Sequence, residues 1–230
     1  MSAPLWSRLV AEAIGTAFLL AIVIGSGIMG ERLSMGIPAL ALLANSMATG
    51  CGLAVLILVF APISGAHFNP AVTLVAALEK EIAWKDAGPY IAVQIAMAFA
   101  GVAAAHLMFG EPIFSASTKI RTGPAQWLSE AIATFGLIAI IVGCIRQQSK
   151  ATPFAVAAYI TAAYWFTSST SFANPAVTLA RAASNTFAGI RPEDAGGFVI
   201  AQLAGALLAH VVMRKLAPRS LSRECHTPSV

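Results

Sequence analysis

The hexapeptide Asn-Pro-Ala-Val-Thr-Leu occurs twice in the chain, at residues 69–74 and again at residues 174–179. Proline suits the first position of a helix, because the N–H that it lacks would have no partner there. An Asn directly before it can cap the exposed N–H groups. Each copy therefore predicts the start of a helix. Two short helices that begin at matching places in two halves of a chain are typical of a transport site at the midplane of a membrane.

Apolar segments make up most of the chain. Hydrophobic residues account for 58% of the 230 residues and charged residues for only 10%, and the mean hydropathy is +0.78. A spanning helix needs about 20 apolar residues, and six segments are candidates: residues 9–30, 38–61, 88–109, 128–145, 153–167 and 196–216. Residues 69–78 and 174–183 are too short to span and are predicted as half-helices that enter from opposite faces. Unpaired backbone at that depth must line a cavity or be buried in protein, so we expect a pore between them.

The two halves of the chain repeat each other. The residues around Glu12 read Ala-Glu-Ala-Ile-Gly-Thr, those around Glu130 read Ser-Glu-Ala-Ile-Ala-Thr, and Gln94 and Gln202 lie in similar segments. Each half contains two spans, a half-helix and a third span. Because three is an odd number, the halves must insert with opposite orientations.

These features predict an all-α membrane protein with six transmembrane helices, two half-helices and an inverted 3+3 repeat. Repeat 1 covers about residues 8–109 and repeat 2 about residues 126–216. Neither half could bury its own polar face. We therefore expect a single transmembrane channel domain over residues 1–230, with a polar C-terminal tail at 217–230.

The basic residues are unequally distributed between the two sides. With an even number of spans both termini share one side, which holds nine of the 14 Lys and Arg residues: Arg8, Lys80, Lys85, Arg146, Lys150, Arg214, Lys215, Arg219 and Arg223. The positive-inside rule places both termini in the cytoplasm, so we expect a multi-pass protein of the inner (plasma) membrane. The net charge of +4 follows from this bias and does not indicate nucleic acid as a partner.

The segment Ser-Gly-Ala-His-Phe-Asn-Pro-Ala-Val-Thr at residues 64–73 resembles the first signature of the aquaporin (major intrinsic protein) family. The Asn-Pro-Ala at residues 174–176 resembles the second, and the likeness extends over almost the whole chain. The resemblance implies an hourglass-shaped pore in the lipid bilayer, passive transport of small uncharged solutes, and a homotetramer with four independent pores. It implies neither an enzyme nor a cofactor.

The candidate pore motifs are Asn69, Pro70 and Ala71 in the first half and Asn174, Pro175 and Ala176 in the second. Each half-helix would direct its positive dipole end toward the midplane, and the two Asn amides would donate hydrogen bonds to a passing water or hydroxyl group. A single file oriented in this way resists proton hopping, and the positive ends repel cations. The alternative is that both Asn residues are only helix caps.

Three ionisable residues lie close to these motifs in the predicted fold. Glu12 and Glu130 lie inside spans, where an ionisable group is a functional candidate. In the resembled family such glutamates accept the backbone N–H groups of the half-helix loops, and we expect this supporting role rather than proton transfer. The resemblance places His67 on the cytoplasmic pore wall, where it lines or gates the path. No spacing of His, Cys and Asp indicates a metal site.

The selectivity filter departs from the family pattern. Water channels and glycerol facilitators usually carry Arg directly after the second Asn-Pro-Ala, and here that position is Val177. Offsets from the motifs give Thr49, Ala162 and Ser171 as the other filter positions. This set has no aromatic ring and no charge, so we expect a wide filter. Val in place of Arg resembles the AqpS-type bacterial aquaglyceroporins associated with arsenic-resistance operons, which implies arsenite and methylated arsenicals as further substrates.

Arg181 follows Val177 by four residues and so lies on the same helix face, one turn outward. One interpretation is an interfacial arginine whose side chain reaches water. The other is the fixed positive charge nearest the outer vestibule, which would draw acidic solutes to the mouth.

Other functions stay open at this point. One is a water-selective channel, and another is a proton-coupled secondary transporter, since inverted repeats and broken helices serve both mechanisms. A solute flux that is insensitive to a pH gradient would exclude the transporter. A third is a structural membrane protein with a closed pore, which would give no permeability above background in liposomes.

Overall fold

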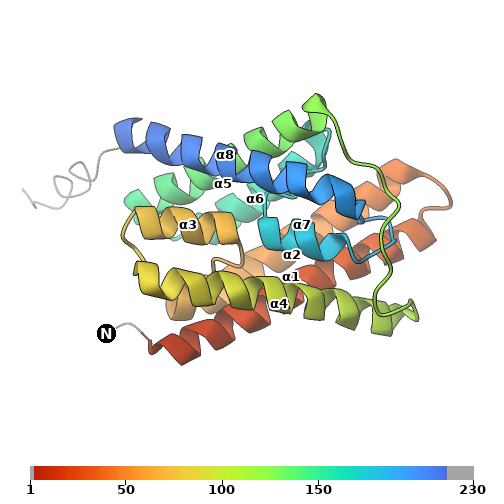
Figure 1. The fold of residues 1–230 in the computed structure, drawn as a ribbon, viewed down its shortest axis with the longest axis horizontal. Coiled ribbons are helices and arrows are strands. Elements are labelled where there is room, and N and C mark those ends of the chain that lie inside the picture. The colour runs from red at the N-terminus through yellow and green to blue at the C-terminus, as the bar shows by residue number, and fades with distance from the viewer. Residues whose placement is uncertain (1–2, 217–230) are drawn as a thin grey trace, which may run out of the picture.

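The computed structural model describes residues 3–216, which contain eight helices and no strand (Figure 1). The helices are α1 (Leu5–Leu33), α2 (Pro38–Ser64), α3 (Pro70–Leu78), α4 (Trp84–Phe109), α5 (Pro124–Arg146), α6 (Thr152–Phe166), α7 (Pro175–Arg181) and α8 (Pro192–Leu216). The predicted polar tail at residues 217–230 lies outside the described residues.

Within residues 3–216, five helices are long and apolar enough to cross a membrane, namely α1, α2, α4, α5 and α8. The sixth predicted span is α6, which has 15 residues and is about 22 Å long at 1.5 Å per residue. It packs against α2 and α5 like the other spans, although it is shorter than the hydrocarbon core of about 30 Å. The predicted all-α arrangement of long helices and two half-helices is confirmed.

The two short helices are α3 and α7, with 9 and 7 residues. Each begins at the proline of its motif, after an Asn that acts as the N-cap: the Asn69 side chain accepts the Ala71 N–H at 2.9 Å, and the Asn174 side chain accepts the Ala176 N–H at 3.0 Å. Figure 1 shows α3 reaching inward from the end of the bundle where α1 begins and α8 finishes, which we call the terminal end. Helix α7 reaches inward from the opposite end, which we call the far end.

The two repeats interlock through these half-helices. Helix α1 packs against α2 and α4, and α5 packs against α6 and α8, so each repeat forms a group of its own. Helix α2 joins the groups by packing against α6. Helix α7 packs against α4 of the other repeat, and α3 packs against α8. Each half-helix is therefore held by both repeats.

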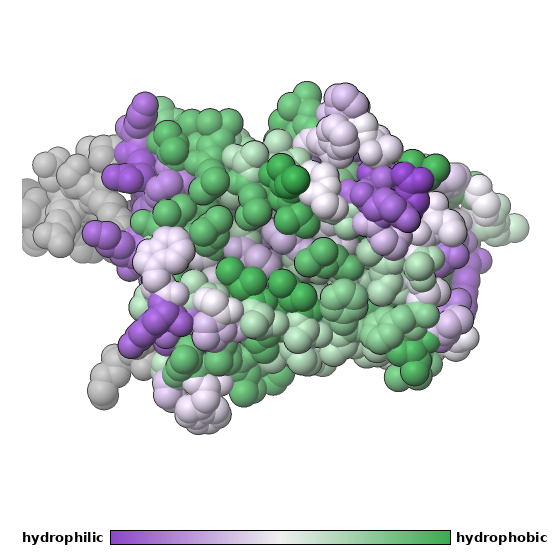
Figure 2. All heavy atoms as spheres, viewed as in Figure 1, coloured by the Kyte–Doolittle hydropathy of each residue, from purple (hydrophilic) through white to green (hydrophobic). Residues whose placement is uncertain are grey.

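Apolar side chains cover the middle of the bundle, and hydrophilic residues gather at its two ends (Figure 2). Large apolar side chains such as Phe18, Val55 and Leu208 are exposed there. A soluble protein rarely exposes a continuous apolar surface of this extent. A band of this kind between two polar ends fits a bilayer.

One glycine in each repeat sets the spacing between its first and third spans. A Cβ atom at Gly101 of α4 would clash with the backbone carbonyl of Ala17 in α1, and one at Gly205 of α8 would clash with that of Ala131 in α5. The same close approach thus recurs in both repeats, between the first and the third span.

We predict that Gly205→Ala destabilises the fold by about 1–3 kcal/mol, because the added methyl group meets backbone that cannot move aside. Gly196→Ala in the same helix is the matched control, since a Cβ there has no neighbour within 4 Å. Replacing a glycine in a helix should stabilise the control slightly, by about 0.5–1 kcal/mol. Thermal unfolding in detergent measures both, and equal melting temperatures for the two variants would contradict the close contact.

Candidate functional site

The loops before α3 and α7 adopt the same unusual backbone. Ala66 and Phe68 have φ angles of +50° and +49°, and Ser171 and Ala173 have the same two values. Non-glycine residues in the left-handed region cost about 1–3 kcal/mol each and persist only where the surroundings hold them. The contacts that hold these loops are therefore central to the site.

Glu12 of α1 holds the first loop and is fully buried. Its Oε1 accepts the His67 N–H at 2.9 Å, and its Oε2 accepts the Phe68 N–H at 2.7 Å. The Ser64 hydroxyl and the Gln94 amide also donate to this carboxylate, at 2.6 and 2.8 Å. Hydrogen bonds to an ionised acceptor are about twice as strong as neutral ones, so this group can fix a strained loop.

Glu130 of α5 holds the second loop in the same way and is also fully buried. Its two oxygens accept the N–H groups of Phe172 and Ala173, both at 2.9 Å. The Gln202 amide donates to Oε2 at 2.6 Å. The two carboxylates thus share three equivalent contacts, two loop N–H groups and one Gln amide, and the Ser64 hydroxyl adds a fourth donor to Glu12 alone.

The two Asn side chains join the loops to each other. Asn69 Nδ2 donates to the Ala173 carbonyl at 2.8 Å, and Asn174 Nδ2 donates to the Phe68 carbonyl at 2.8 Å. A side-chain amide has two N–H donors, and the second one of each Asn has no acceptor among residues 3–216. Both side chains line a cavity. Each amide therefore keeps one donor for a molecule in that cavity.

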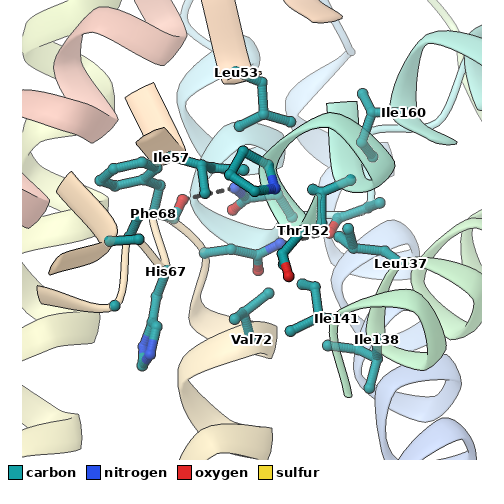
Figure 3. A pocket seen from close by; sticks show the side chains of 18 of the residues that line it. Leu53, Ile57, His67, Phe68, Val72, Leu137, Ile138, Ile141, Thr152 and Ile160 are labelled. Atoms are coloured by element: carbon teal, nitrogen blue, oxygen red, sulfur yellow. Dashed lines mark hydrogen bonds between the residues drawn. The ribbon is translucent and has the colours of Figure 1, made fainter. Parts of the chain in front are cut away.

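A cavity of about 550 Å³ lies between the two repeats. At the terminal end it is lined by Glu79 and Lys150, and at its centre by Asn69 and Asn174. Figure 3 shows the aliphatic wall and the His67 ring around it; the labelled aliphatic residues are Leu53, Ile57, Val72, Leu137, Ile138, Ile141 and Ile160. His67 Nδ1 lies 3.1 Å from the hydroxyl oxygen of Thr73. The passage thus has an aliphatic side and a side of polar groups.

At the far end the cavity lies between α2, α6 and α7. Thr49, Tyr164, Ser171 and Val177 all line it there, and all four are buried. The Tyr164 hydroxyl donates to Thr49 Oγ1 at 3.2 Å. The buried Ser171 hydroxyl has no hydrogen-bond partner among the described residues, which is rare for a buried polar group and calls for an explanation.

Three basic side chains converge near this end. The Arg181 guanidinium lies over the Phe172 ring, 3.3 Å from its centroid, and its Nε donates to the Ala188 carbonyl. Arg121 lies 5.1 Å from the centroid of the same ring. Burial lowers the pKa of the Arg121 guanidinium to about 10. Burial, and then the nearby charges of Arg121 and Arg181, lower the pKa of the Lys119 ammonium to about 8.

Comparison with known proteins identifies the family. The model of the Major intrinsic protein family matches residues 1–163. The chain is 57% identical over 209 residues to the aquaglyceroporin AqpS of Rhizobium meliloti, and the match covers 91% of this chain and 89% of that protein. The chain belongs to the major intrinsic protein family.

Two further matches agree. Aquaporin NIP2-2 of Zea mays is 32% identical over 93% of this chain and 74% of its own length. The X-ray structure of the aquaglyceroporin from Plasmodium falciparum has the same fold, with a TM-score of 0.72 over 96% of this chain and 100% of that one, at 16% identity. Members of the family are membrane channels, so the chain is a multi-pass channel for small solutes and not an enzyme.

The family pattern led to one wrong filter residue. Ala162 does not line the cavity but lies on the outer surface, in a shallow groove with Met47 and Trp165. The side chains that α6 directs into the cavity near this level are Ile160 and Tyr164. The offset from the second motif crosses the end of α6 and a loop, and the two positions between Ala162 and Tyr164 turn a helical side chain by about 200°.

The cavity wall at the far end also carries aromatic rings and a charge, which none of the four predicted filter positions has. Tyr164, Phe172 and Arg181 all line the cavity at its far end. Arg181 is only 2% exposed, which contradicts an interfacial arginine that reaches water. Its burial was missed because Phe172 and Ala188, which hold it, lie in loops on either side of α7.

We predict that Glu130→Gln lowers the stability of the channel. Gln has one acceptor oxygen, so the N–H of Phe172 or of Ala173 would lose its partner, at a cost of about 1–3 kcal/mol. Glu193→Gln is the control, because the Glu193 side chain is 72% exposed. Melting temperature and the folded fraction after size exclusion measure the effect. A Glu130→Gln protein as stable as the control would show that the carboxylate is not needed to hold the loop.

Proposed function

We propose that this channel passively conducts small neutral hydroxylated solutes through a filter without Arg at position 177. The substrates would be water, glycerol-like polyols, arsenite as As(OH)3, and methylated arsenicals. As(OH)3 is a neutral, polyol-like molecule of about the size of glycerol. The likeness to an aquaglyceroporin over most of the chain supports the solute class, and Val177 supports a ring wide enough for solutes larger than water.

The observation that carries the proposal is the set of unused polar groups opposite an aliphatic wall. The Ser171 hydroxyl and one N–H each of Asn69 and Asn174 have no partner among residues 3–216. Leu53 and Ile57 are among the aliphatic side chains of the same cavity. A solute with hydroxyl groups and a carbon or arsenic framework satisfies both sides, and a cation would lose hydration without a counter-charge.

Orientation and assembly form part of the same proposal. Basic residues at the terminal end, such as Arg8, Lys85 and Arg214, favour a cytoplasmic location for both termini in the plasma membrane. His67 then lines the cytoplasmic half of the pore. The exposed apolar band leaves room for the homotetramer that is typical of this family.

A solute panel in proteoliposomes tests the function. Purified protein should raise the flux of water, glycerol and arsenite above that of protein-free liposomes, without dependence on an imposed pH gradient. Flux of water alone would favour a water-selective channel. Coupling to the pH gradient would favour a secondary transporter, and no flux at all would favour a closed structural protein.

We predict that Val177→Arg reduces glycerol flux about tenfold and water flux much less. The long side chain narrows the ring, and an added barrier of about 1.4 kcal/mol corresponds to a factor of ten. Val177→Leu is the neutral control, which adds volume without charge and should have a smaller effect. Stopped-flow light scattering measures both fluxes. Equal loss for all solutes in correctly folded protein would contradict the assignment of Val177 to the filter.

A further inference from the structure

Arg181 lies at the far end of the same cavity that Asn69, Asn174 and Val177 line. It is one turn beyond Val177 on α7, a distance of about 6 Å along the helix axis. Its side chain is nearly fully buried. The guanidinium is therefore part of the channel wall at a level separate from that of Val177.

The guanidinium is fixed in place by both loops that flank α7. Its face lies against the Phe172 ring, and its Nε donates to the Ala188 carbonyl. The Phe172 backbone is held in turn by Glu130. These contacts use only one of the guanidinium nitrogens. The two terminal amino groups have no acceptor among residues 3–216.

The positive charge of Arg181 is not paired. No carboxylate lies within 4.0 Å of it among the described residues. Glu130 acts on it through space, but the oxygens of Glu130 already accept three hydrogen bonds. Arg121 adds a second positive charge at the same ring. A cavity with low-dielectric walls focuses such a field.

We propose that Arg181 is the residue that excludes cations from this channel, and that it does so from a level one turn outside the ring at Val177. An inorganic cation or hydronium that entered would have to pass an unpaired guanidinium in a poorly screened site. A neutral solute meets no such barrier. Solutes are then selected by charge at Arg181 and by size at Val177, at two separate levels of the pore. The filter at Val177 therefore stays wide. The inference rests on the proposed channel function.

The test measures two fluxes in proteoliposomes of the full-length protein, K⁺ or H⁺ conductance and glycerol flux. The wild type should conduct glycerol while its cation conductance stays at the level of protein-free liposomes. Arg181→Met keeps the length of the side chain and its contact with Phe172 but removes the charge. It should raise the cation conductance at least tenfold, with glycerol flux within about twofold of wild type. Arg181→Lys keeps the charge and should stay closed to cations.

Arg191→Met is the matched control. It removes a positive charge from the same end of the molecule, but Arg191 is paired with Asp194 at 2.8 Å and does not line the cavity. Its cation conductance should equal that of wild type. The double variant Val177→Arg with Arg181→Met returns a guanidinium to the pore, and it should restore cation exclusion at the expense of glycerol flux.

Two outcomes would overturn the inference. One is cation conductance by the wild-type channel, which is measured without any variant. The other is an Arg181→Met protein that elutes like wild type in size exclusion and stays closed to cations. Absence of glycerol flux in the wild type would overturn the proposed function instead; a cation leak confined to Arg181→Met would still support the role of Arg181.

Discussion

Hydrogen bonds from loop N–H groups to two buried carboxylates are the interaction on which this structure depends. Glu12 and Glu130 each accept two successive backbone N–H groups from the loop before a half-helix. Those loops contain residues such as Phe68 and Ala173 in the left-handed region, which is unfavourable without external support. A buried carboxylate is itself costly unless its oxygens are satisfied, and here the loop satisfies them. Charge and strained backbone stabilise each other.

The same loops place the pore on the boundary between the repeats. Each motif Asn caps its own half-helix with its carbonyl oxygen and bonds the opposite loop with its amide. Because α3 packs against α8 and α7 against α4, neither repeat can position its half-helix alone. The two Asn side chains that line the passage consequently also hold the fold together, and only their remaining donors face a solute.

The elements of the fold could be predicted from the sequence because their signals are local. Apolar length marks the spans, Asn-Pro marks the half-helix starts, and the repeated Glu marks the symmetry. The residues that line the cavity at its far end could not be predicted, because they depend on the rotation of α6 and on contacts between loops. Ala162 and Tyr164 differ by two positions, yet one faces outward and the other faces the cavity. The burial of Arg181 likewise arises from Phe172 and Ala188 and not from its own neighbours along α7.

The position of Arg181 is difficult to explain by stability alone. Removing a charged side chain from water costs several kcal/mol. Stacking on Phe172 contributes about 2 kcal/mol of stabilisation when the pair is desolvated, and a hydrogen bond from a charged donor contributes about 1.5–3 kcal/mol. These two gains at best balance the cost of burying the charge. An apolar side chain would fill the site without that cost. A guanidinium that faces the cavity with unused donors, next to a small Val177 that leaves the ring open, is better explained by its effect on what enters the channel.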